Sequence, residues 1–241
     1  MKLKEVSTIP VPIMPEDIKE ALNANKITPL KYADKNELLI NEELQKEEGY
    51  TFLDDGTALV AMTCPMPGIT AEMIDWWMWW HPSDSRRYQA WFPGAHISIN
   101  YPKKYASYYE QESMPEFRPN VNCPKETVGA MTTHCVISFK YPRDIGINEK
   151  LLKENGFGTV VCGHVGIKGL FAHTEMIHCY KETKDGLILI SRFWMGEPMK
   201  NKFLKKKLIT EKLAYGMAEH CYIEYRRLVR ILPKLYAEYR R

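Results

Sequence analysis

The feature that most constrains the fold of this chain is one long amphipathic segment near its C-terminus. From Phe203 to Tyr239, apolar side chains recur at helical spacing, which predicts one long helix with a single apolar face. That face carries Leu204, Leu208, Leu213, Met217, Cys221, Leu228 and Leu232. Pro233 is expected to kink the helix or end it locally, because proline cannot donate a backbone hydrogen bond. The rest of the chain must then supply a layer against which the apolar face packs.

Segments rich in β-branched and aromatic residues precede the helix and predict that this layer is a sheet. They cover residues 96–101, 135–141, 159–167, 174–182 and 187–193, and a shorter hairpin is expected over residues 50–63. Lys184-Asp185-Gly186 separates the last two segments and is a hairpin signal. A twisted antiparallel sheet followed by one long helix is an α+β arrangement. If the helix lies across the concave side of the sheet, a cavity is left between the two layers.

The first part of the chain has a different character. Residues 1–48 are expected to form a mainly helical lead-in, with a short helix from Pro15 to Ala24, and residues 49–241 to form the main domain. Thr70 is expected to cap a further helix that runs through Trp80, where Pro82 bounds it.

Composition excludes several classes of protein. The net charge of the 241-residue chain is only +3, and its late lysines and arginines are typical of the solvated side of a helix, which argues against a nucleic-acid partner. No apolar stretch approaches the length of a membrane span, and the N-terminus does not resemble a signal peptide. The six cysteines include no Cys-x-x-Cys pair, so we expect free thiols in a cytoplasmic protein.

The predicted helix carries two residues suited to bind a metal. His220 and Glu224 are four residues apart, which places an imidazole and a carboxylate on one face of the helix. A hydrogen-bonded pair is the more common meaning of this spacing, but the same pair forms half of a zinc site. His81, which ends an aromatic helix, is a third candidate ligand. Glu126, just before a strand, is the preferred fourth ligand, and Glu112 is the alternative.

Three more histidines lie on strand-like segments. They are His164, His173 and His178, and the last two are five residues apart, so at most one of them should face a cavity if the strand is regular. The sequence contains no serine-nucleophile elbow, P-loop or dinucleotide fingerprint.

Four motifs together resemble the diacetylphloroglucinol hydrolase and phloretin hydrolase family. They are Asp75-Trp76-Trp77-Met78-Trp79-Trp80-His81, then Arg87-Tyr88-x-x-Trp91 followed by Pro93 and His96, then Ser191-Arg192-Phe193-Trp194-x-Gly196, and finally His220-x-x-x-Glu224. The resemblance covers roughly residues 50–225.

This resemblance implies a helix-grip catalytic domain of the Bet v 1-like or START-like kind, and a homodimer. It implies one zinc ion held by two histidines and two glutamates, here His81, His220, Glu224 and a strand glutamate. The local pattern Glu-x-x-Gly before a strand favours Glu126 as that glutamate, whereas the spacing along the chain favours Glu112. The implied reaction is hydrolysis of the carbon–carbon bond between a phenolic ring and an acyl group.

The residues expected to bind phenolic hydroxyls or to move protons are Asp75 and His178, with His164 as a weaker candidate. Two other functions remain open at this point. One is a non-enzymatic helix-grip carrier of aromatic ligands, which needs the cavity but not the metal. The other is a metal-dependent hydrolase of non-aromatic β-diketones on the same scaffold.

Overall fold

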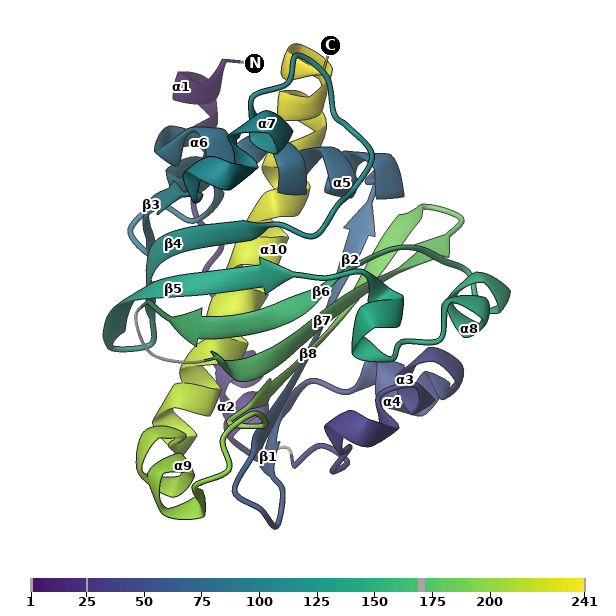
Figure 1. Cartoon of the computed structure of the whole chain (residues 1–241), viewed down its shortest axis with the longest axis vertical. Coiled ribbons are helices and arrows are strands. Elements are labelled where there is room, and N and C mark those ends of the chain that lie inside the picture. The colour runs from purple at the N-terminus through teal and green to yellow at the C-terminus, as the bar shows by residue number, and fades with distance from the viewer. Residues whose placement is uncertain (1, 25, 169–171, 241) are drawn as a thin grey trace.

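The computed structural model describes residues 2–24, 26–168 and 172–240, and it confirms the predicted α+β arrangement. Within these residues, eight strands form one fully antiparallel sheet in the order β1-β2-β8-β7-β6-β5-β4-β3 (Figure 1). The strands are β1 (Gly49–Phe52), β2 (Ala58–Pro67), β3 (His96–Asn100), β4 (Val121–Val128), β5 (Met131–Phe139), β6 (Phe157–Ile167), β7 (Ala172–Thr183) and β8 (Gly186–Met195). This order brings the early hairpin β1–β2 beside the late strand β8.

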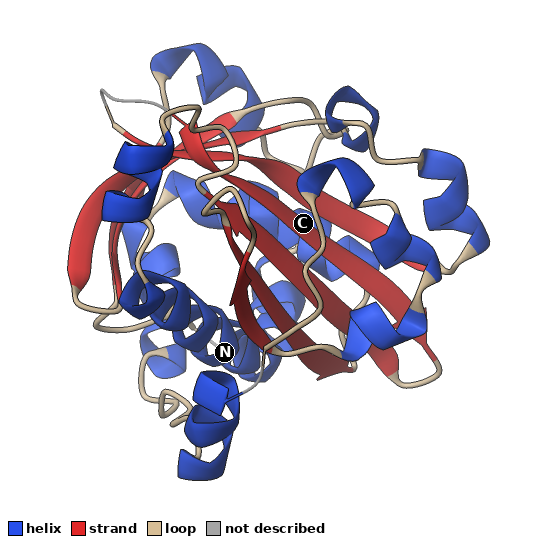
Figure 2. Ribbon diagram, turned by 90° about the horizontal axis from the view of Figure 1, so that it is seen from below, coloured by secondary structure: helices blue, strands red, loops and turns tan. Residues whose placement is uncertain are grey.

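Helices lie on both faces of this sheet (Figure 2). The α-helices are α1 (Leu3–Val6), α2 (Glu16–Ala24), α3 (Glu37–Ile40), α4 (Glu42–Lys46), α5 (Ala71–Trp80), α6 (Ser85–Trp91), α7 (Ala106–Tyr109), α8 (Glu149–Glu154), α9 (Lys202–Leu208) and α10 (Glu211–Tyr239). The described residues also form four short 3₁₀ helices, namely η1 (Tyr32–Asp34), η2 (His81–Ser83), η3 (Lys103–Tyr105) and η4 (Pro142–Ile145). None of the helices in the described part of the chain is long and apolar enough to cross a membrane.

The predicted C-terminal helix is in fact two helices. The chain leaves helical geometry at Ile209, and Thr210 caps a new helix by accepting a hydrogen bond from the backbone N–H of Leu213 at 3.3 Å. The resulting α10 contains Pro233 and continues to Tyr239, so the proline does not end it. This helix packs against β1 and β2 at one edge of the sheet and against β4 near the other, and thus spans the sheet.

Two groups of buried apolar side chains cover the two faces of the sheet. The inner face, which we define as the face toward α10, shares a core with α5, α6 and α10. The outer face packs against apolar residues of the segment 27–44 and of α8, including Leu38, Leu39 and Leu152. The N-terminal helices therefore contribute to both cores, because Val6 and Leu22 belong to the inner one. The division into a lead-in over residues 1–48 and a domain over 49–241 stays a prediction.

A buried arginine ties the start of the chain to α10. The Arg227 side chain is fully buried, and its Nε donates a hydrogen bond to the Ala90 carbonyl oxygen of α6 at 2.9 Å. Its two other nitrogens donate to the carbonyl oxygens of Val6 and Ile9. Three backbone carbonyls thus satisfy most of the donors of one guanidinium, which is the condition for burying such a charge.

The tip of the β4–β5 hairpin lies directly against α10. Gly129, at the turn, has a φ of +57°, and a Cβ atom built on Gly216 of α10 would lie only 2.9 Å from its Cα. Real Cβ contacts are longer than this, so the close approach requires glycine at position 216, whereas at position 129 the positive φ is what favours glycine. The contact fixes the distance between β4 and the turn of α10 that precedes His220.

Candidate metal centre and substrate cavity

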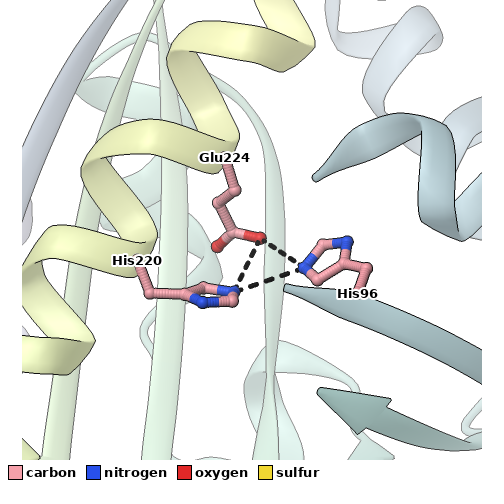
Figure 3. Close-up of side chains that lie close together, drawn as sticks. All are labelled: His96, His220 and Glu224. Atoms are coloured by element: carbon pink, nitrogen blue, oxygen red, sulfur yellow. Dashed lines mark hydrogen bonds and ion pairs between the residues drawn. The ribbon is translucent and has the colours of Figure 1, made fainter. Parts of the chain in front are cut away.

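Three buried side chains converge between α10 and the sheet. His96 begins β3, whereas His220 and Glu224 lie one turn apart on α10 (Figure 3). The Nε2 atoms of the two histidines are 3.3 Å apart, and Oε2 of Glu224 lies 3.6 Å from the first and 3.8 Å from the second. Ligand atoms at these distances can share one ion, and the three residues form a candidate metal group.

The outer nitrogen of each imidazole is held by a backbone carbonyl. Nδ1 of His96 lies 3.1 Å from the carbonyl oxygen of Tyr88, and Nδ1 of His220 lies 3.1 Å from that of Thr127. A carbonyl only accepts, so each Nδ1 carries the proton, and in a neutral ring each Nε2 then presents a lone pair. Two lone pairs 3.3 Å apart repel one another unless a cation or a proton lies between them. Backbone carbonyls commonly orient metal-binding histidines in this way.

Burial also disfavours charge on these groups when no ion balances it. It lowers the pKa of His96 well below its ordinary value, with His220 adding to the effect, and it lowers the pKa of His220 as well. It raises the pKa of Glu224 far above its ordinary value, and the nearby carboxylate of Glu126 acts in the same direction. Neutral imidazoles beside two close carboxylates form a donor set that a divalent cation would stabilise.

Glu126 lies beside this group on the neighbouring strand. It pairs directly with His96 across the β3–β4 ladder, and the hydroxyl of Tyr88 donates a hydrogen bond to its carboxylate. The Tyr88 ring stacks on the His96 ring, with centroids 3.8 Å apart and an angle of 5° between their planes. Burial raises the pKa of Tyr88 well above its ordinary value, so the hydroxyl keeps its proton and remains a donor. Tyr88 thus positions one carboxylate and one imidazole at the same time.

A cavity of about 260 Å³ lies between the sheet and α10 and reaches the candidate metal group. Its walls are mostly aliphatic, aromatic and methionine side chains, and Glu126, His220 and Glu224 lie among the few polar residues that line it. This is the usual character of a site for a small organic molecule, with apolar walls and a small set of polar groups that fix orientation.

Comparison with known proteins agrees with this architecture. The family model described as "DAPG hydrolase PhiG domain" matches residues 30–237, which is most of the chain. The chain belongs to the DAPG hydrolase family. It is 34% identical over 226 residues to the 2,4-diacetylphloroglucinol hydrolase of Pseudomonas protegens (strain DSM 19095 / LMG 27888 / CFBP 6595 / CHA0), an alignment that covers 86% of this chain and 73% of that protein. It is 32% identical over 232 residues to the phloretin hydrolase of Eubacterium ramulus, covering 90% and 82%.

In this member of the DAPG hydrolase family, the histidine that joins His220 in the candidate metal group is His96, which the sequence analysis did not single out as a ligand. The predicted ligand His81 is buried nearby and lines the same cavity, but its Nδ1 lies 2.7 Å from the Trp77 carbonyl oxygen and its ring stacks on Trp77. It is not one of the three residues whose ligand atoms converge. A ligand role for His81 stays a prediction.

Of the predicted strand glutamates, Glu126 lies at the cavity and Glu112 does not. Glu112 is exposed in the loop between α7 and β4. The β3–β4 register explains the difference, because it sets Glu126 opposite His96.

His173 and His178 both line the cavity, although at most one of them was expected to face it. The expectation was wrong because β7 is irregular at this point. Thr174 pairs with Val165 and Ala172 with Gly166, so His173 is an extra residue that breaks the alternation of the strand. Nδ1 of His178 lies 2.9 Å from Oγ of Ser191, and complete burial lowers the pKa of His178 to about 3.

Asp75 and His164, the other residues expected to take part in catalysis, lie away from the cavity wall. Asp75 is exposed and accepts a hydrogen bond from the Thr159 hydroxyl at 2.6 Å. His164 is on the outer face, where its Nδ1 lies 2.6 Å from the Glu175 carboxylate. Neither is among the residues that line the cavity, and their catalytic roles stay predictions.

Proposed function

We propose that this protein is a zinc-dependent hydrolase that cleaves the carbon–carbon bond between a phenolic ring and an acyl group. The products are a phenol and a carboxylic acid. The observation that carries the proposal is the meeting of two imidazole Nε2 atoms and a carboxylate, buried at the wall of an apolar cavity, in a chain of this family. A sheet spanned by one long helix also supports the helix-grip assignment of the fold.

The proposed ligands are His96, Glu126, His220 and Glu224. Two nitrogen and two oxygen donors suit zinc, and the set differs from the sequence prediction only in that His96 takes the place of His81. Glu126 completes the set because it is the second carboxylate at the site and pairs with His96 across two neighbouring strands. When bound, the ion would supply Lewis-acid chemistry and lower the pKa of water.

The reaction consumes one water molecule. Oxygen from water bonds to the acyl carbon, and the bond from that carbon to the ring breaks. The ring can accept the electron pair because a phenolic hydroxyl lets it react as a keto tautomer, in which the negative charge reaches oxygen. A proton then returns to the ring carbon, so the acyl phenol and water become the free phenol and the carboxylic acid.

His178 is the cavity residue best placed to bind a phenolic oxygen. Its Nδ1 lies against Ser191, and in the described part of the chain no hydrogen bond involves its Nε2, which is left for a bound molecule. Because burial keeps this imidazole neutral, its Nε2 can form a hydrogen bond with a phenolic hydroxyl without adding a positive charge to the cavity. The apolar walls exclude bulk water, which strengthens such a bond.

The test is to measure metal content and turnover on the same preparations. Purified protein should contain close to one zinc ion per chain and should hydrolyse phloretin or an acylphloroglucinol. The variant His220→Ala should lose both metal and activity, whereas His134→Ala, at an exposed histidine of β5, should keep both.

Two outcomes would replace the proposal with another function. Tight binding of aromatic ligands after chelation, without turnover of any acyl phenol, would indicate a carrier. Turnover of simple β-diketones alone would indicate a hydrolase with a non-aromatic substrate. Assembly as a homodimer and a cytoplasmic location stay predictions.

A further inference from the structure

The cavity has two ends with different chemistry. One end holds the candidate metal group together with Tyr88, Glu126 and His178. The other end is walled by apolar side chains, which are Met131, Met199, Leu208, Ile209, Leu213 and Met217. Its polar neighbours His173 and Thr174 lie against each other, with Nδ1 and Oγ1 2.9 Å apart. None of these residues offers a carboxylate or an amine.

The apolar end extends along α10. Met217 and Leu213 precede His220 by one and two turns, and all three line the cavity. Seven residues of helix span about 10 Å, roughly the length of an extended chain of eight carbons. Beyond Leu213, the cavity reaches the surface at Met131 on the β4–β5 hairpin and at Leu208 on α9, both of which are 45% exposed.

The two halves of an acyl phenol therefore have distinct places in this cavity. A ring with several hydroxyls loses hydrogen bonds to water on burial and must regain them from the protein. The polar groups that can provide them lie at the candidate metal group and at His178, whose ring packs against Tyr225, the residue that follows Glu224. Apart from His173 and Thr174, which bond to each other, the apolar end offers hydrocarbon and thioether surface, so it is the place for the acyl chain.

We infer that this protein selects acyl phenols whose acyl group is a long apolar chain, alkyl or arylalkyl, over those that carry an acetyl group. The chain lies along α10 past Met217 and Leu213, with its far end at the mouth formed by Met131 and Leu208. This inference rests on the proposed function, since it assigns the part of the substrate that the apolar end of the cavity holds.

The experiment uses a series of acylphloroglucinols with straight acyl chains from acetyl to octanoyl and the zinc-loaded protein. Each methylene that is buried in the cavity can raise kcat/KM by up to about fourfold, which corresponds to about 0.8 kcal/mol. We therefore expect kcat/KM to rise with each added carbon and to reach at least tenfold over the whole series. The variant Leu213→Trp fills the apolar end of the cavity. It should reduce kcat/KM for the octanoyl substrate much more than for the acetyl substrate. Lys212→Trp is the matched control, because the Lys212 side chain is next to Leu213 in sequence but is exposed. This variant should show the same dependence of kcat/KM on chain length as the unmodified protein.

If Leu213→Trp does not fold, Leu208→Trp tests the same end of the cavity at its exposed mouth, where a larger side chain disturbs little packing. A series that is flat or best for acetyl would overturn the inference and leave the proposed function intact. A series in which no member is cleaved, by a protein that contains zinc, would instead overturn the proposed function.

Discussion

Replacing Gly216 by alanine separates two opposing effects on α10. In the interior of an exposed helix, alanine is more favourable than glycine by about 1 kcal/mol, so the change normally stabilises. Here the new Cβ would lie 2.9 Å from the Gly129 Cα and 3.0 Å from its backbone nitrogen. Ordinary carbon contacts are about 3.5–4 Å, so the hairpin must move outward by roughly 0.5–1 Å. Both groups belong to the main chain and cannot rotate away.

The consequence should appear at the metal group. The same hairpin carries Glu126 and the Thr127 carbonyl, which lies 3.1 Å from Nδ1 of His220. Displacing a group that orients a metal ligand typically costs about 10–100-fold in metal affinity. We therefore expect Gly216→Ala to weaken zinc binding by about that factor in a competition assay with a chelator, with no gain in the thermal stability of the metal-free protein.

Two glycine-to-alanine changes in turns provide the matched comparison. Gly129→Ala adds a Cβ 3.4 Å from the Gly216 Cα, whereas Gly156→Ala adds one with no neighbour within 4 Å, and both glycines have positive φ. Both variants should lose stability from backbone strain. Only Gly129 forms the turn that follows Glu126 and Thr127, so only Gly129→Ala should also lose metal affinity. A Gly216→Ala protein that gains about 1 kcal/mol and binds zinc as before would refute the reasoning.

Three further predictions concern single side chains. His96→Ala should abolish stoichiometric zinc binding, measured by elemental analysis, whereas His81→Ala should retain it. Loss of zinc from the His81→Ala variant alone would show that His81 is the ligand. Tyr88→Phe keeps the ring on His96 but removes the hydrogen bond to Glu126, and should lower kcat about tenfold or more with the fold intact by circular dichroism. Burial lowers the pKa of His178 to about 3, so between about pH 6.5 and 3 this residue binds more protons in the unfolded chain than in the folded one. Its contribution should lower the free energy of unfolding by about 1.4 kcal/mol for each pH unit of acidification in that window. The variant His178→Gln should lack this contribution when the free energy of unfolding is measured by denaturant titration at several pH values.

The parts of the site that sequence could predict are the local ones. His220 and Glu224 are four residues apart on a helix, so their common face follows from the chain alone. The choice between His81 and His96 depends instead on how a strand edge meets α10. Both histidines flank Tyr88 in the structure, with ring centroids 5.9 and 3.8 Å from the tyrosine ring, and no spacing rule distinguishes them.

The same distinction between local and long-range information explains the fold. Thr70 and the helix after it were predicted correctly, because a capping side chain acts within three residues. The break before α10 also has a local signal, the Thr210 cap, but the continuous apolar spacing from Leu204 to Leu213 concealed it. The extra residue at His173 has no signal in β7 itself, since it appears only when β7 pairs with β6.

The buried guanidinium of Arg227 makes the first ten residues a structural support for α10, which lies near the C-terminal end of the chain. A shortened protein that starts after Ile9 would lose two of its three carbonyl partners, and an uncompensated buried charge typically costs about 3–5 kcal/mol. That cost would fall on α10, which holds His220 and Glu224, and on α6, which carries Tyr88. Trimming the amino terminus to improve crystals would therefore damage a site of which two ligands, His220 and Glu224, lie more than two hundred positions downstream in the sequence.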